Sequence, residues 1–285
     1  MIHYILLGAS LVCSVGRNVF SKLGGDRFSG LANVLGTNIF TAVLALIVFG
    51  ITMPDLTLIT PEIVLFALAY SVLSMLSPCL HIMALERGSV SVCSLIYGCA
   101  FLLPTVFGMF FKRDVPGVLS VIGIILVISA IILTTGKPGK GGGYVFISVA
   151  AMVASGGVGI AQTIFSNTHE ESLQNELLFT AFTINLIISA IMLAVLRIRK
   201  TANPIKINKR YFICALMLAA CVVGQNRINL DLAGKLPSVV MFPVASGGGI
   251  AATTMLSTVL FREKLNPRQI VGIYVAIAAI IIIFS

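Results

Sequence analysis

About ten long apolar stretches follow one another along this chain, and they constrain its fold more than any other feature. A helix rises about 1.5 Å per residue, so about 20 apolar residues cross the roughly 30 Å hydrocarbon layer of a bilayer. Lipid offers no partner for free backbone amides and carbonyls, so stretches this long predict helices rather than the short alternating segments of a barrel. The predicted spans lie near 2–23, 31–52, 62–83, 89–111, 116–135, 144–166, 176–196, 210–230, 236–261 and 267–284.

Composition favours the same fold class, an all-α membrane protein. Hydrophobic residues make up 58% of the chain and charged residues only 10%, against roughly 25% charged in a soluble domain. The net charge of +9 is typical of the Lys and Arg excess in cytoplasmic loops, so the expected partner is the bilayer and not nucleic acid. Residues 1–22 lack a basic start and a small-residue cleavage site, which predicts a retained first span. The cysteines show no disulfide or zinc spacing, and we expect no metal and no cofactor.

The chain divides into two similar halves, 1–136 and 144–285, around the Gly/Lys linker KPGKGGG at 137–143. The linker lacks the GK[ST] ending of a phosphate-binding loop, so a flexible joint is the favoured interpretation. A shift of 149 residues, without gaps, aligns the two halves of the sequence. It pairs Gly98 with Gly247, Arg113 with Arg262, Asp114 with Glu263, Gly123 with Gly272, and Ser89-Val90 with Ser238-Val239. Because each half has an odd number of spans, five, the repeats should be inverted in the membrane, as in many secondary transporters.

Short motifs recur at the ends of the two halves. They are FKRD at 111–114 followed by Gly123-Ile124, FREKL at 261–265 followed by Gly272-Ile273, Ala84-Leu85-Glu86-Arg87 before Ser89, and Lys22 at the end of the first span. With these motifs the chain resembles the ten-helix EamA-type members of the drug/metabolite transporter superfamily. The resemblance implies that a small metabolite is held centrally between the halves and carried by alternating access. The chain departs from the pattern where Arg113 and Arg262 replace glycine, where Asp114 replaces glutamate, and in having no Trp.

The basic residues separate by loop and predict an orientation. One side receives Lys22, Arg27, Arg87, Lys137, Lys140, Arg197, Arg199, Lys200, Lys206, Lys209, Arg210, Arg262, Lys264 and Arg268, and the other receives Lys112, Arg113 and Lys235. The positive-inside rule then places both termini outside a plasma or inner membrane. The resemblance implies the opposite, with both termini in the cytoplasm. The charge distribution is the preferred guide.

Polar side chains within apolar spans are the candidate substrate-binding residues, because burying them in a membrane is costly unless they have a role. They are Arg17, Asn18, Asn38, Tyr70, Ser74, His81, Tyr97, Gln162, Asn185, Gln225, Asn226 and Asn229. Tyr70, Ser74, Ser77 and His81 recur at helical spacing and predict one polar face. Packing between helices is the alternative role for the amides. Arg17 and Arg227 both lie within predicted spans and are candidate cations of a substrate cavity. The alternative for Arg17 is that its side chain snorkels to the membrane interface, and the alternative for Arg227 is that Asp231, four residues later, neutralises it.

Prolines and glycines inside spans are candidate gating residues: Pro78, Pro104, Pro243, Gly247 and Gly248. Proline frees a carbonyl one turn earlier and weakens the helix there. Close helix packing is the alternative role of these glycines and of Gly156, Gly157 and Gly159.

The acidic residues all lie at span ends or in loops. Exporters of lipophilic cations in the smallest branch of the superfamily that this chain resembles rely on a carboxylate embedded in the membrane, so the resemblance argues against a lipophilic cation as substrate. We therefore expect a secondary transporter for a small polar metabolite that is neutral, zwitterionic or anionic. The alternative is an uncoupled channel or a lipid-flipping partner subunit. An enzyme is disfavoured and no catalytic residue is assigned, because Ser77 and His81 are the one Ser–His pair near a span mouth and no nucleophile elbow accompanies them. A monomer would suffice for transport, and a homodimer remains open.

Overall fold

The computed structural model describes residues 2–24, 30–52, 56–87, 90–114, 116–134, 143–199, 209–261 and 267–284. Within these ranges the chain forms helices and no strand. The α-helices are α1 (Ile2–Gly24), α2 (Leu31–Thr52), α3 (Pro61–Arg87), α4 (Val90–Gly98), α5 (Leu102–Phe111), α6 (Val118–Thr134), α7 (Gly143–Thr168), α8 (Gln174–Ile198), α9 (Lys209–Lys235), α10 (Ser238–Phe261) and α11 (Pro267–Phe284). Three short 3-10 turns join them: η2 (Leu56–Leu58), η3 (Cys99–Phe101) and η4 (Glu171–Leu173). Most of the linker 137–143, Ser89 and residues 262–265 of the second motif lie outside the described residues.

The predicted all-α membrane fold is confirmed. In the part of the chain that the structure describes, seven helices are long and apolar enough to cross a membrane. They are Ile2–Ser21, Leu31–Thr52, Pro61–Arg87, Gly143–Thr168, Glu171–Ile198, Tyr211–Lys235 and Ser238–Leu256. Three shorter apolar helices, Ile96–Phe111, Val118–Leu133 and Pro267–Ile283, lie within the remaining predicted spans, 89–111, 116–135 and 267–284, but are shorter than those spans.

Local sequence signals set where several helices begin. Pro61 and Pro267 each occupy the first position of a helix, α3 and α11, where proline costs no hydrogen bond and its fixed φ suits the helix. Thr60 precedes α3 and its Oγ1 accepts from the Ile63 amide at 3.4 Å, as an N-cap residue does. Gly30 has a φ of +84° immediately before α2, a backbone conformation that side chains disfavour. The chain therefore marks these helix starts locally.

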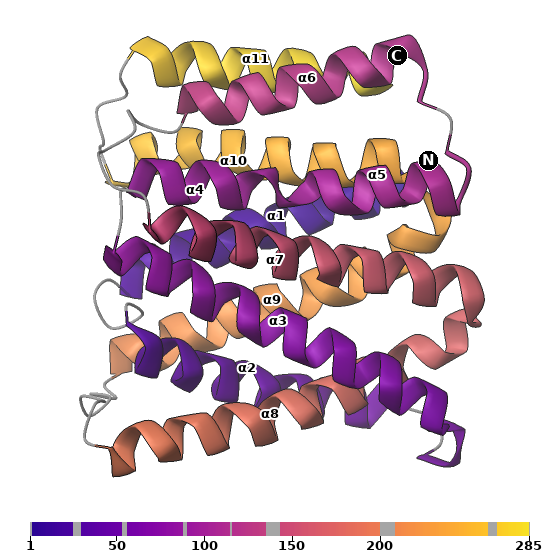
Figure 1. Ribbon diagram of the computed structural model, residues 1–285, viewed down its shortest axis with the longest axis vertical. Coiled ribbons are helices and arrows are strands. Elements are labelled where there is room, and N and C mark those ends of the chain that lie inside the picture. The colour runs from indigo at the N-terminus through magenta and orange to yellow at the C-terminus, as the bar shows by residue number, and fades with distance from the viewer. Residues whose placement is uncertain are drawn as a thin grey trace.

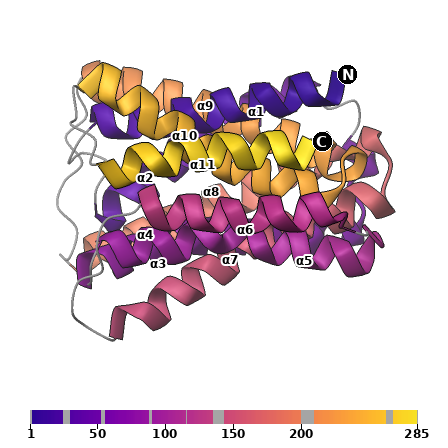
Figure 2. The ribbon, with the colours of Figure 1, turned by 90° about the horizontal axis from the view of Figure 1, so that it is seen from above.

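The helices lie roughly side by side across the molecule, with α6 and α11 at one end of its long axis and α2 and α8 at the other (Figure 1). Both termini lie at the same edge of the bundle, as the turned view also shows (Figure 2). The most extensive contacts pair α1 with α9, α3 with α7, α6 with α11 and α2 with α8. Each of these pairs joins a helix from residues 1–136 to one from residues 144–285. The two halves therefore interlock rather than form separate bodies.

Two large apolar clusters form the core. One is built on α2, α3, α7, α8 and α9 and contains Phe49, Ile63, Phe165, Leu178 and Leu230, among others. The other is built on α1, η3, α6, α9, α10 and α11 and contains Leu7, Phe101, Val127, Met241 and Ala279, among others. Helix α9 contributes to both clusters, so it ties the two ends of the bundle together.

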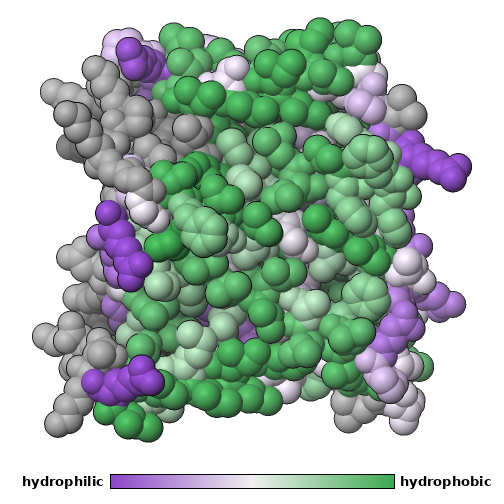
Figure 3. All heavy atoms as spheres, viewed as in Figure 1, coloured by the Kyte–Doolittle hydropathy of each residue, from purple (hydrophilic) through white to green (hydrophobic). Residues whose placement is uncertain are grey.

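The outer surface of the bundle is apolar over its middle. Hydrophobic residues cover the centre of the face in Figure 3, and the hydrophilic side chains gather along its two edges. Phe110 is 82% exposed and Phe146 is 80% exposed, and many other large aliphatic side chains are also exposed. Apolar surface of this extent is unusual for a soluble monomer and suits contact with lipid. The apolar band between two polar edges fits a multi-pass membrane protein.

Candidate functional site

Three predicted residues from three helices meet in a central polar cluster, defined here as Tyr70, Gln162 and Asn226. The Tyr70 hydroxyl on α3 donates to Asn226 Oδ1 on α9 at 2.5 Å. Gln162 Nε2 on α7 donates to the same hydroxyl oxygen at 3.3 Å. Tyr70 and Gln162 are 2% and 3% exposed. Hydrogen bonds made inside an apolar bundle hold their groups firmly, since water is not available to replace them.

A second group of polar residues joins α3 to α4, and it contains the predicted residues His81 and Tyr97. The Ser77 hydroxyl and the Tyr97 hydroxyl lie 3.0 Å apart. The His81 ring stacks on the Tyr97 ring with centroids 4.1 Å apart. The buried Nδ1 of His81 has no hydrogen-bond partner among the described residues. Tyr97 therefore contacts both members of the Ser–His pair noted in the sequence.

The predicted polar face of α3 is shared among several neighbours. Tyr70 contacts α7 and α9, and Ser77 and His81 contact α4. Ser74 instead accepts from Asn185 Nδ2 on α8 at 3.4 Å. The face is polar as predicted, but its members belong to different contacts.

The remaining predicted polar residues lie apart from the central polar cluster. Asn229 accepts from the Ser10 hydroxyl at 2.6 Å, and Asn18 donates to Thr253 Oγ1 at 3.2 Å, so these two amides bridge helices. The Asn38 amide nitrogen is buried and has no partner within the described ranges. Arg17 is exposed on α1, and Gln225 is partly buried on α9. The structure thus brings three candidates together in the central polar cluster, pairs His81 with Tyr97 and Ser74 with Asn185, and distributes the others over the bundle.

The candidate gating prolines differ in their effect on the helix. Helices α3 and α10 continue through Pro78 and Pro243. The helix that contains Pro104 is instead interrupted by the 3-10 turn η3, one turn before the proline. Since proline provides no amide hydrogen, the carbonyl of Ala100 loses its helical partner there. The 3-10 turn η3 contains Ala100, so the interruption lies at the residue whose carbonyl loses its partner.

Glycines allow α7 to pack closely on this interrupted helix. A Cβ on Gly156 would lie 2.7 Å from Leu103 Cβ and 2.8 Å from the Ala100 carbonyl oxygen. A Cβ on Gly247 or Gly248 would meet only side-chain atoms, at 3.1 Å. Close backbone approach is the usual reason for glycine between membrane helices. Of Gly156, Gly247 and Gly248, this reason applies most strongly to Gly156.

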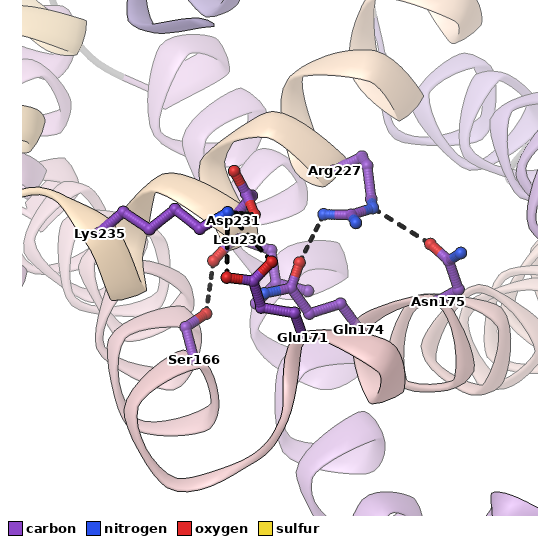
Figure 4. A network of polar contacts seen from close by, with 8 residues as sticks. All are labelled: Ser166, Glu171, Gln174, Asn175, Arg227, Leu230, Asp231 and Lys235. Carbon is purple, nitrogen blue, oxygen red and sulfur yellow. Dashed lines mark hydrogen bonds and ion pairs between the residues drawn. The ribbon is translucent and has the colours of Figure 1, made fainter. Parts of the chain in front are cut away.

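A polar network joins η4 and the start of α8 to the C-terminal part of α9 (Figure 4). Arg227 on α9 donates through Nε to Asn175 Oδ1 at 3.1 Å and through a terminal nitrogen to Gln174 Oε1. Asp231 pairs instead with Lys235, at 2.7 Å. The expectation that Asp231 could neutralise Arg227 is therefore wrong, because the neighbouring lysine takes the carboxylate. Within the described ranges, no carboxylate lies at ion-pair distance from the Arg227 guanidinium.

The FKRD motif links α5 to the junction between α9 and α10, a role that sequence reasoning missed. Lys112 Nζ donates to the carbonyls of Ala233 and Leu236 at 3.1 and 2.7 Å. Asp114 Oδ2 accepts from the Ser238 amide at 2.8 Å. The cation thus meets the carbonyl end of α9, and the anion meets the amide end of α10, as helix dipoles favour. Burial lowers the pKa of Lys112 from its ordinary value, and the nearby Asp114 charge partly offsets this shift.

The burial of Glu176 is a further feature that sequence reasoning missed. It lies in the first turn of α8, at a span end as predicted, but its side chain is fully buried at 0% exposure. Neither of its carboxylate oxygens has a hydrogen-bond partner among the described residues. A position at a helix end suggested access to water, and only the packing of neighbouring helices removes that access.

A cavity lies apart from the polar contacts described above. A cavity of about 350 Å³ is lined, among described residues, by Gly30, Ile82, Leu85 and Glu86 at the edge opposite the termini. Across the part of the chain that the structure describes, no group of three His, Cys, Asp or Glu residues is placed to hold a metal ion.

Comparison with known proteins identifies a similar fold. No family model matches the chain, and no curated protein matches it. A solved chain described as "Crystal structure of protein" superposes with a TM-score of 0.76 and covers 100% of this chain and 98% of its own length. The two sequences are 9% identical. This similarity concerns the fold alone.

Proposed function

We propose that this protein is a secondary transporter that moves a small polar metabolite across a cell membrane by alternating access. The observation that carries the proposal is the central polar cluster. Tyr70, Gln162 and Asn226 place hydroxyl and amide groups between three apolar helices of a membrane bundle. Polar groups at such a position are costly and usually mark a substrate path. Amides and hydroxyls can bind neutral, zwitterionic or anionic groups through hydrogen bonds.

The proposed architecture is ten spans arranged as two inverted repeats of the EamA type. The pattern of helix pairs supports it. If α1, α2, α3, α4–α5 and α6 are the five spans of the first half, and α7 to α11 those of the second, a two-fold axis exchanges the α1–α9 pair with the α3–α7 pair. The same axis maps the α2–α8 and α6–α11 pairs onto themselves. Substrates of such transporters bind between the repeats near mid-depth.

The positive charge of Arg227 favours a substrate that carries an anionic group. Its guanidinium is held by amide oxygens of Gln174 and Asn175, which orient the charge without neutralising it. It is partly exposed. A fixed guanidinium suits recognition of a carboxylate or phosphate.

A ligand panel tests the proposal. Detergent-purified protein is heated with amino acids, organic anions or quaternary ammonium compounds, and its unfolding temperature is measured. A ligand at 100 times its Kd should stabilise the folded form by about 2.7 kcal/mol. Compounds that stabilise the protein are then tested for counterflow in proteoliposomes, with protein-free liposomes as the control. Transport of a quaternary ammonium compound without any amino acid or organic anion would contradict the proposed substrate class. Flux that neither saturates nor shows counterflow would favour the channel.

A further inference from the structure

Two free cysteines lie in the contact between α1 and α9, one on each helix. A Cβ on Gly224 of α9 would lie 3.5 Å from the sulfur of Cys13 on α1. A Cβ on Gly16 of α1 would lie 2.7 Å from the sulfur of Cys221 on α9. Each thiol therefore lies against the other helix, at a position where a glycine leaves room for the sulfur.

The order of these contacts brings the two thiols close together. The hydrogen bond from Ser10 to Asn229 lies before the cysteine contacts on α1 and after them on α9, so the two helices are antiparallel. On each helix the cysteine and the glycine are three residues apart, which offsets the two cysteines by about 4.5 Å along the helix axes. The Cys13 thiol is close enough to Cys221 to interact with it electrostatically. Two thiols from different halves of the chain thus share one place.

A cation lies beside the two thiols. Arg17 follows Cys13 by four residues, so both side chains lie on one face of α1. Its guanidinium interacts electrostatically with the Cys221 thiol. Within the described ranges, no carboxylate forms an ion pair with Arg17. A negative charge on the two sulfurs would therefore have a compensating cation, as a charge inside a membrane protein requires.

The other four cysteines lie in different parts of the bundle. Cys79, Cys93 and Cys214 are buried in three separate apolar clusters. Cys99 lies in η3, which packs mainly on α7. These positions supply matched controls for the pair in the contact between α1 and α9.

We propose that Cys13 and Cys221 form a two-thiolate site for a soft monovalent metal ion of the Cu(I) class. Thiolate is the ligand that Cu(I) prefers, and closed-shell monovalent ions accept two such ligands. A structural zinc site would need four ligands, and no group of three candidate ligands exists among the described residues. When the ion binds, two S–H bonds break, two metal–sulfur bonds form and two protons pass to water.

The bound group carries one net negative charge, because two thiolates surround one monovalent cation. The Arg17 guanidinium balances this charge. The ion would join α1 of the first half to α9 of the second. The site goes beyond the proposed transport function and does not depend on it.

Phenylarsine oxide tests whether both sulfurs can reach one atom. Its arsenic forms two As–S bonds with neighbouring thiols, and the oxygen leaves as water with the two thiol protons. A chain with Cys13 and Cys221 as its only cysteines should retain one arsenical per chain after a wash with excess monothiol, as measured by intact mass. A chain with only Cys99 and Cys214 should retain none. In the wild type, peptide mapping should place the adduct on Cys13 and Cys221, a result that depends on no variant. Loss of the adduct in the wash, or its location on other cysteines, would overturn the inference.

Silver ion is the metal probe, because it prefers the same ligands as Cu(I) and is stable in air. Calorimetric titration of the detergent-purified wild type should show one tight site per chain. Arg17→Gln keeps both ligands and should weaken binding by about 10–100-fold, as loss of a supporting group does. Cys13→Ser and Cys221→Ser should each weaken it further, and Cys99→Ser should leave it unchanged. Equal affinity in Cys13→Ser and the wild type would refute the site, whatever substrate the protein transports.

Discussion

The Tyr70 hydroxyl donates to Asn226 Oδ1 at 2.5 Å and thereby joins α3 of the first half to α9 of the second. Gln162 Nε2 of α7 donates to the Tyr70 hydroxyl oxygen at 3.3 Å, so this hydroxyl both donates and accepts a hydrogen bond. The ring of Tyr70 also belongs to the apolar cluster of α2, α3, α7, α8 and α9. One residue therefore takes part both in packing the bundle and in its central polar cluster.

Removal of this hydroxyl should destabilise the protein measurably. Tyr70→Phe keeps the ring but leaves Asn226 Oδ1 and Gln162 Nε2 without their partner, which costs about 1–3 kcal/mol. Thermal unfolding in detergent measures the change. Tyr274, which is 69% exposed on α11, provides the control. Equal unfolding temperatures for Tyr70→Phe and Tyr274→Phe would show that the cluster contributes nothing to stability.

Arg227→Met should be more harmful than Lys235→Met. Loss of the guanidinium leaves the amide oxygens of Gln174 and Asn175 unpaired, with an expected cost of about 1–3 kcal/mol. Lys235 pairs with two carboxylates at the surface, where an ion pair contributes at most about 1 kcal/mol. The free energy of unfolding of each variant is compared with the wild type. If Arg227 also binds substrate, its variant should lose the stabilisation that anionic ligands give to the wild type.

Gly156→Ala should force α7 away from the interrupted helix at η3. The added Cβ would lie 2.8 Å from the Ala100 carbonyl oxygen, and backbone yields less readily than a side chain. Overpacking of this kind typically costs about 1–3 kcal/mol. A Cβ on Gly8 of α1 meets no atom within 4 Å, so Gly8→Ala should be neutral or gain up to about 1 kcal/mol from helix propensity. The reverse order of stability would show that the approach at Gly156 is not tight.

Arg113→Gly should stabilise the protein. Arg113 has a φ of 56°, in the left-handed region, and follows Lys112, the C-cap residue of α5. This conformation costs a residue with a side chain about 1–2 kcal/mol, which glycine would not incur. Glycine is also more flexible in the unfolded chain, and this offsets about half of the stabilisation. The net expectation is a gain of about 0.5–1 kcal/mol. Arg113→Ala removes the same charge without relieving the backbone, so a gain of equal size in the alanine variant would assign the effect to charge.

The orientation of the protein can be measured directly. Both termini lie at one edge of the bundle, and the C-terminal ends of α3 and α8 lie at the other (Figure 1). Arg87 is in the last turn of α3 and Arg197 in the last turn of α8. The positive-inside rule then predicts that both termini face outward. A reporter that fluoresces only in the cytoplasm, fused after Ser285, should stay dark. Fluorescence from this fusion would favour the orientation that the EamA-type resemblance implies.

The helix positions could be predicted from the sequence, because the bounds of membrane helices depend on residues within or next to each helix. Apolar length, the prolines at 61 and 267 and the glycine at 30 act within a few residues, and the helix bounds follow them closely. The interruption at η3 could also be expected from Pro104, since the lost hydrogen bond is one turn away. The motif at 111–114 was recognised by its repetition, but its hydrogen bonds to Leu236 and Ser238 span more than 120 residues and had no local signal.

Sequence alone determined that this chain is a bundle of apolar helices, because hydropathy and helix rise depend only on neighbouring residues. The tertiary structure decided which polar groups meet. Tyr70, Gln162 and Asn226 come together, while Asn18, Asn185 and Asn229 find other partners. It also decided that Asp231 forms an ion pair with Lys235 and not with Arg227, and that Glu176 is buried at the start of α8. Burial and pairing depend on which helices pack together, and that packing follows from contacts far apart in the sequence.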